Sequence, residues 1–134
     1  MKLLLDTHIL LWWLLDSDLL SQAARDYIGD TENSIYYSIV SILEIELKFL
    51  AHPGKIDFSG EQVLGYCNDA GFGRMDLTAK HILGLASLHR PEEAPPHKDP
   101  FDRLMLCQAK VEGMMFLTHD HLIPDYHESC VLYV

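Results

Sequence analysis

The sequence is short of cysteine and of ordered histidine patterns, and these shortages exclude several classes of site. Its three cysteines are an odd number without any CxxC pair, which argues against a disulfide framework and a cysteine-rich zinc site. The eight histidines are scattered without HExxH or similar spacing, so most are expected at the surface. No Ser-His-Asp or Cys-His arrangement for nucleophilic catalysis is recognisable. No apolar run approaches the roughly 20 residues that a membrane helix requires.

Basic residues are also scarce, with 10 lysines and arginines against 20 aspartates and glutamates, for a net charge of -10. This balance argues against broad, nonspecific nucleic-acid binding. It does not exclude a nuclease, because bound divalent cations would reverse the local field. The apolar N-terminus is interrupted by acidic residues and has no small-residue cleavage site. We therefore expect no signal peptide, a cytoplasmic location and reduced thiols.

The length of 134 residues and the apolar share of 49% fit one globular domain, residues 1–134. Short apolar or β-branched runs predict strands at residues 2–5, 35–38, 75–77, 114–118 and 130–133. The intervening segments predict helices at residues 7–16, 21–29, 41–51, 59–70, 78–88 and 99–112. Residues 90–96 hold three prolines and form a loop within the domain. This alternation predicts an α/β fold with a parallel sheet covered on both faces.

Four acidic residues lie where the predicted strands and helices meet. Asp6 and Asp120 each follow a predicted strand, and an open parallel sheet binds ligands beyond the carboxyl ends of its strands. Glu44 and Asp102 fall in the first turns of predicted helices. Carboxylates gathered in one place repel each other unless a cation neutralises them. A cluster of oxygen ligands in an α/β domain indicates Mg²⁺ or Mn²⁺.

Two of these acids also have purely structural interpretations. Asp6 could cap the helix that follows it, as aspartate often does. Glu44 stands three residues after Ser41, which is the spacing of a capping box at the helix start. Lys48 lies four residues after Glu44 and could hold its carboxylate in a helical ion pair.

The third and fourth acidic positions carry alternatives of their own. Asp99 precedes a proline and is a natural N-cap, which makes Asp102 the third residue of the helix. Asp102 should point toward the core, yet both aspartates stay candidates for the metal site. Asp120 could be an ordinary loop residue after a strand, and Thr118 could donate a hydrogen bond to a carboxylate nearby.

Four segments in order resemble a known family: LLLDTHILLWWL, SILEIELK, HKDPFDRLMLCQA and FLTHD. Together they are similar to PIN-domain ribonucleases, and in particular to the VapC-type toxins of bacterial type II toxin–antitoxin pairs. The resemblance covers essentially the whole chain. It implies a three-layer α/β/α sandwich with a central parallel sheet of four to five strands, and a Mg²⁺- or Mn²⁺-dependent endoribonuclease.

The resemblance also assigns site residues. It implies that the catalytic, metal-binding acids are Asp6, Glu44, Asp102 and Asp120, with Asp99 competing for the third position.

Hydroxyl and basic residues complete the assignment. Thr7 and Thr118 match small hydroxyl positions beside the site. Arg103 and Lys48 are candidates for contacts with substrate phosphates. Cys107 stands where the family often has alanine and should change packing rather than chemistry.

The implied partners are an RNA substrate, a second copy of the chain in a homodimer, and a small antitoxin with an apolar helix. Trp12 or Trp13 is expected to line the antitoxin groove. A receiver-type phosphoacceptor domain is disfavoured because Thr7 follows Asp6 and no lysine follows the last strand. A haloacid-dehalogenase-like phosphatase would need a DxD motif after the first strand, and His8 stands where its second aspartate would be. A non-toxin PIN-like nuclease and a catalytically silent PIN-like interaction module stay open as alternatives.

Overall fold

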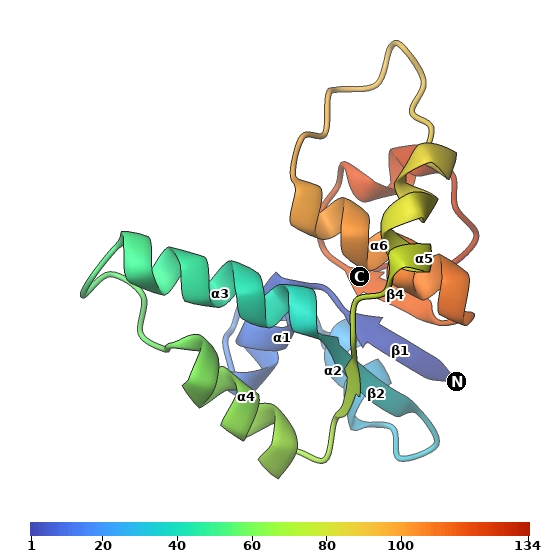
Figure 1. Cartoon of the computed structure of the whole chain (residues 1–134). Helices are drawn as coiled ribbons and strands as arrows, with labels where there is room; N and C mark the ends of the chain where they lie inside the picture. The colour runs from blue at the N-terminus through green and yellow to red at the C-terminus, as the bar shows by residue number, and fades with distance from the viewer.

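The computed structural model describes residues 1–134, and a five-stranded sheet runs through its centre (Figure 1). All neighbouring strands are parallel, in the order β3-β2-β1-β4-β5. The strands are β1 (Lys2–Leu5), β2 (Ser34–Ser38), β3 (Gly73–Met75), β4 (Met115–Thr118) and β5 (Val131–Tyr133). Parallel pairing requires a crossover between strands, and helices supply most of these crossovers.

Six α-helices and two short 3₁₀ helices connect and cover the strands. They are α1 (Thr7–Leu14), α2 (Gln22–Gly29), α3 (Ile39–Ala51), α4 (Gly60–Asp69), α5 (Ala79–Leu83), η1 (Gly84–Ser87), α6 (Pro100–Glu112) and η2 (Ile123–Tyr126). None of these helices combines the length and apolar character of a membrane span.

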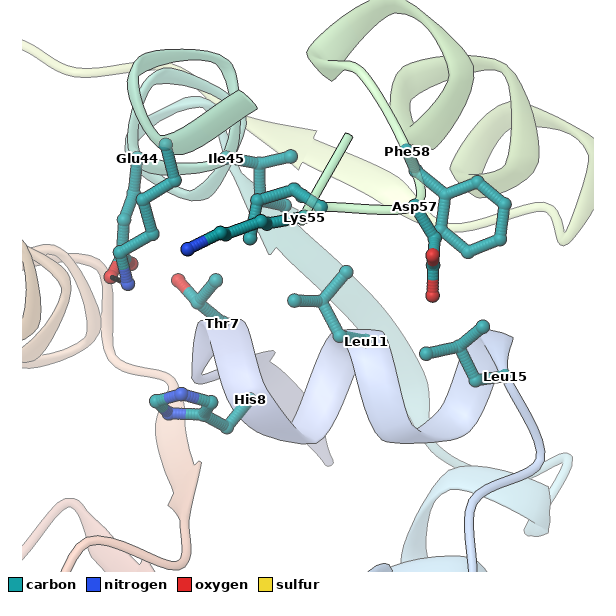
Figure 2. A pocket seen from close by; sticks show the side chains of 11 residues that line it. Thr7, His8, Leu11, Leu15, Glu44, Ile45, Lys55, Asp57 and Phe58 are labelled. Carbon is teal, nitrogen blue, oxygen red and sulfur yellow. Dashed lines mark hydrogen bonds and ion pairs between the residues drawn. The ribbon is translucent and has the colours of Figure 1, made fainter. Parts of the chain in front are cut away.

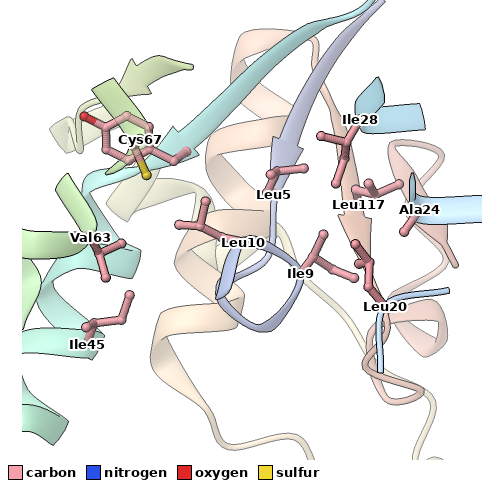
Figure 3. Close-up of a cluster of buried hydrophobic side chains, with 11 residues drawn as sticks. Leu5, Ile9, Leu10, Leu20, Ala24, Ile28, Ile45, Val63, Cys67 and Leu117 are labelled. Atoms are coloured by element: carbon pink, nitrogen blue, oxygen red, sulfur yellow. The ribbon is translucent and has the colours of Figure 1, made fainter. Parts of the chain in front are cut away.

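The core is divided into two apolar clusters by the sheet. Successive strand side chains point to opposite faces, so Leu5 and Leu117 join one cluster while Leu4 and Phe116 join the other. The first cluster packs against α1 to α4 (Figure 3). The second packs mainly against α6 and η2. Both faces of the sheet are therefore covered, which confirms the predicted α/β/α sandwich.

The predicted capping box at the start of α3 is wrong. The helix begins earlier, at Ile39, and the side chain of Ser38 accepts a hydrogen bond from the backbone N–H of Val40 at 3.0 Å. Ser41 is buried inside the first turn, and its hydroxyl lies 2.8 Å from that of Thr7. Residue 38 was expected to end a strand, and here it both ends β2 and caps α3.

Two other boundaries differ from the sequence prediction. β3 covers Gly73–Met75 and begins two residues earlier than predicted, directly after the turn. Gly73 lies against the ring of Tyr36, where a β-carbon would come within 2.5 Å of the aromatic atoms. The predicted helix 78–88 is divided into α5 and the tighter η1.

Trp12 and Trp13, which neighbour each other on α1, are both half-buried and pack against the first cluster. Neither ring is completely hidden from solvent.

The register of the sheet positions the acids. Leu5 pairs with Tyr37 on one side and with Leu117 on the other. The next residue, Asp6, therefore emerges from the sheet beside Ser38 and Thr118, at the carboxyl edge where α1 and α3 begin.

Candidate active site

Asp6 is buried at the junction of β1 and α1, with only 2% of its surface exposed. One carboxylate oxygen accepts the backbone N–H of His8 at 3.3 Å, so the residue does cap α1. The other accepts the hydroxyl of Thr118 at 2.6 Å. Burial raises the pKa of Asp6, the bond from Thr118 opposes the rise, and the charge of Asp120 adds to it.

Thr118 links the ends of the two central strands. Its hydroxyl donates to Asp6 and accepts the backbone N–H of Asp120 at 3.1 Å. This is the expected hydrogen bond from Thr118 to a carboxylate. One oxygen of Asp120 accepts the backbone N–H of Leu122 at 2.9 Å, which fixes the side chain after β4. The second oxygen is left to face the interior of the site.

Asp99 and Asp102 have different roles at the start of α6. Asp99 is the N-cap and accepts the backbone N–H groups of Phe101 at 2.9 Å and of Asp102 at 3.3 Å. Asp102 is buried, and its carboxyl faces Asp120 across the site. Burial, together with the charges of Asp6, Asp99, Glu44 and Asp120, raises the pKa of Asp102 to about 9.

Glu44 reaches the site from the second turn of α3 and is 3% exposed. One of its oxygens accepts Lys48 Nζ at 2.8 Å, which is the expected i,i+4 pair. The other oxygen is buried without a hydrogen-bond partner. Burial opposes the charge on Lys48, but the bond and charge of Glu44, with Asp99 and Asp102, leave the pKa of Lys48 raised.

Three of the four acids lack basic partners. Asp6, Asp102 and Asp120 form no ion pair with a lysine or arginine. The imidazole of His97 lies closest to two of them, with Nε2 3.5 Å from Asp102 Oδ2 and 3.6 Å from Asp120 Oδ2. Oxygens of the two aspartates and this nitrogen all lie within 4.8 Å of one another. This uncompensated negative charge fits a divalent cation.

The family model for the PIN domain matches residues 3–128 of this sequence. The chain belongs to the PIN-domain family. No curated protein sequence matches it significantly.

Solved structures with the same fold share little sequence with this PIN domain. VapBC2 from Rickettsia felis bound to a promoter DNA fragment has 17% identity, a TM-score of 0.66, and coverage of 100% of this chain and 98% of that one. DNA-bound VapBC from Salmonella typhimurium has 13% identity, a TM-score of 0.65, and coverage of 100% and 97%. A toxin–antitoxin complex from Klebsiella pneumoniae has 17% identity, a TM-score of 0.57, and coverage of 96% and 94%. At these identities the likeness shows the fold.

Two cavities of the PIN domain border the acids. The first, about 200 Å³, is charged at one end, and its other end is mainly apolar with Asp57 beside Phe58 (Figure 2). Thr7, Glu44 and Lys55 point into its charged end, and Leu11 and Phe58 line the apolar end.

The second cavity is about 280 Å³ and shares His8 with the first. Its lining residues are Asp6, His8, Trp12, His119 and Asp120. The indole of Trp12 lies 5.8 Å from the ring of His8 and 5.7 Å from that of His119, measured between centroids. Aromatic rings therefore border Asp6, which is buried, and Asp120, which is half-buried.

The other predicted site residues take more peripheral places. The hydroxyl of Thr7 pairs with Ser41 and reaches the sulfur of Met105 at 3.8 Å, so it connects α1, α3 and α6 behind the acids. Arg103 donates from Nε to the backbone oxygen of Asp99 at 3.4 Å and forms no ion pair.

The sequence prediction missed His97. Most histidines were expected at the surface, but His97 and His81 are buried. His97 comes from the proline-rich loop, and no helix or strand periodicity marks it. Its place two residues before Asp99, in the motif HKDPFD, is the only local signal.

Proposed function

We propose that this PIN domain is a metal-dependent endoribonuclease, the VapC-type toxin of a toxin–antitoxin pair. We assign catalysis and metal binding to Asp6, Glu44, Asp102 and Asp120, with Mg²⁺ or Mn²⁺ as the cofactor. The observation that supports this most directly is the state of Asp102, whose pKa is raised to about 9 by burial and by the surrounding acids. A protein maintains such repulsion at a cost in stability, and perturbed carboxyl groups cluster at functional sites.

Each side chain of the site has its own role in the proposed reaction. When bound, a divalent cation supplies an acidified water and stabilises charge that develops on a phosphate. Thr118 holds one oxygen of Asp6, and Leu122 N–H holds one of Asp120, so each keeps a fixed direction. The unpartnered oxygen of Glu44 is free to accept a proton from the attacking water. Asp99 remains the helix cap rather than a ligand.

Lys48 and Arg103 are our candidates for contacts with the phosphates of the RNA. Arg103 has no ion pair, so its guanidinium is available to a phosphate. Lys48 is half exposed while it pairs with Glu44, and it can exchange that contact for a phosphate oxygen.

The aromatic cavity supports an RNA substrate with unpaired bases. Single-stranded RNA is commonly bound by stacking its bases on aromatic side chains, at about 1–3 kcal/mol per base. The rings of Trp12 and His119 lie beside Asp6 and Asp120, where a base next to the scissile phosphate would reach. Trp12→Ala should raise KM for a single-stranded substrate by about tenfold at similar kcat. An unchanged KM would contradict stacking at this position.

The first cavity suits the antitoxin. Its apolar end, formed by Leu11, Leu15, Ile45 and Phe58, can receive the apolar face of a helix. At its charged end, a basic side chain of that partner can compete with Lys48 for the carboxylate of Glu44. One of the solved structures with this fold is a toxin–antitoxin complex, which supports an antitoxin as the partner. Trp12 lines the other cavity, so we propose that the antitoxin groove is formed by Leu11 of α1 and by Leu15, which follows this helix.

The homodimer is best placed on α3. Leu43, Leu47 and Leu50 form an exposed apolar stripe along this helix, with 49%, 49% and 67% of their surfaces accessible. Exposed leucines at this spacing are typical of helices that pack against another chain. The three unpaired cysteines agree with a reducing cytoplasm.

The deciding experiment is RNA cleavage by purified protein with Mg²⁺, Mn²⁺ or EDTA. Asp6→Asn should reduce cleavage by at least about a hundredfold and weaken metal binding. Asp69→Asn, on the exposed side of α4, is the matched control and should behave like the wild type. Cleavage that survives both EDTA and Asp6→Asn would refute the assignment. A protein that binds an antitoxin but never cleaves RNA would instead be an interaction module.

A further inference from the structure

We propose that His97 is a nitrogen ligand of the cation in this site, and that it makes the site prefer first-row transition ions such as Mn²⁺ over Mg²⁺. The inference rests on the proposed metal-dependent function and adds a fifth side chain to the four acids.

The Nε2 atom of His97 faces the carboxylates of Asp102 and Asp120. His97 is 9% exposed, and its Nε2 atom is buried without a hydrogen-bond partner. The distances of 3.5 and 3.6 Å to Asp102 and Asp120 are too long for good hydrogen bonds. Two ligand atoms that each lie about 2.1 Å from one ion are about 3 Å apart at right angles and about 4.2 Å apart in line. The observed separations fall between these limits.

The other side of the imidazole is held as metal-binding histidines commonly are. Nδ1 lies 2.7 Å from the hydroxyl of Tyr126, and the two rings meet edge to face. When Nδ1 carries the ring proton and donates it to Tyr126, the lone pair of Nε2 faces the acids. Such a partner on the second nitrogen sets the tautomer and orientation of a ligating histidine.

Arg90 in turn holds Tyr126 and the loop that leads to His97. The guanidinium of Arg90 lies over the Tyr126 ring at 4.7 Å from its centre. Arg90 also donates to the backbone oxygens of Pro95 and Leu122. The proline-rich loop and η2 are thereby joined, which keeps His97 in place although it belongs to a loop.

A nitrogen ligand changes which ion the site selects. Mg²⁺ prefers oxygen ligands in a near-octahedral shell and retains several waters. Imidazole binds transition ions better than it binds Mg²⁺. A purely structural His97 would instead carry its proton on Nε2 and bridge the two carboxylates without touching the ion.

Pulsed electron paramagnetic resonance of the Mn²⁺-loaded protein separates these two roles. Direct coordination predicts ¹⁴N modulation in the wild type, and histidine labelled with ¹⁵N should shift it. His97→Gln should abolish the modulation and lower the ratio of Mn²⁺ to Mg²⁺ affinity about tenfold by calorimetry. Tyr126→Phe should keep the modulation and weaken Mn²⁺ binding about tenfold. His119→Gln is the control from the adjacent cavity and should change neither.

The failures of the two proposals are distinguishable. Mn²⁺ that binds and supports RNA cleavage without ¹⁴N modulation overturns the role of His97 and leaves the nuclease proposal standing. Modulation that persists in His97→Gln also overturns it. A protein that binds no Mn²⁺ and cleaves no RNA overturns both. The labelled wild type keeps the test decisive even if His97→Gln does not fold.

Discussion

Replacing Asp102 with asparagine should stabilise the metal-free protein. Asp102 has a pKa of about 9 in the fold, against an ordinary value of 3.8. At pH 7 the unfolded chain therefore holds this carboxyl ionised, while the folded chain must bind a proton to it. Each pH unit between 3.8 and 7 lowers the stability of the folded state by about 1.36 kcal/mol. The penalty is on the order of 4 kcal/mol, which is a large part of the stability of a small domain.

The sign of the pH dependence follows from the same shift. The raised pKa means that the folded state binds more protons than the unfolded state between about pH 4 and pH 9. The free energy of unfolding should therefore fall as pH rises through this window. Asp102→Asn cannot ionise, so the slope contributed by this group should disappear. Other acids of the site, Asp6 first among them, keep part of the slope.

Urea unfolding in EDTA at pH 5.5, 7 and 8.5 measures this directly. The free energy of unfolding of Asp102→Asn should exceed that of the wild type most at pH 8.5 and least at pH 5.5. Asp99→Asn is the neighbouring control, and it should change stability by no more than about 1 kcal/mol because asparagine also caps helices. Added Mn²⁺ should stabilise the wild type and not Asp102→Asn. A variant less stable than the wild type at every pH would refute the reasoning.

Three further changes test other parts of the structure. Thr118→Val removes the hydroxyl that lowers the pKa of Asp6, so it should move the acidic limb of the cleavage profile to higher pH and cost about 1–3 kcal/mol in urea unfolding. Gly113→Ala should cost about 1 kcal/mol by the same assay, because Gly113 has φ 68° and only the backbone conformation opposes a β-carbon there. Leu47→Glu should convert a dimer to monomers in analytical ultracentrifugation, whereas Leu19→Glu, equally apolar and more exposed, should not.

The order and type of every main element could be predicted from the sequence, because the apolar runs have clear lengths. Boundaries were less predictable where one residue serves two elements. Ser38 ends β2 and caps α3, and the capping box at Ser41 was wrong because tertiary contacts bury that hydroxyl against Thr7. Local spacing carries no information about such a contact between residues 34 positions apart.

The sequence also predicted part of the grouping of the acids. Strand ends placed Asp6 and Asp120 at one edge, since parallel strands share that edge. Spacing alone did not distinguish Asp99 from Asp102, whereas in the structure Asp99 caps α6 and Asp102 is buried. The position of His97 beside the acids could not be predicted from the sequence, because tertiary partners position a loop residue, and here they are Tyr126 and Arg90.

The bond between Thr118 and Asp6 joins residues separated by 112 positions. The two central strands beside them are far apart in the sequence and pair side by side. A ribosome therefore has to release Thr118 before it can meet Asp6. Nascent chains would carry scattered carboxyl groups without an assembled pocket, so synthesis itself delays the moment at which this protein acquires its chemistry.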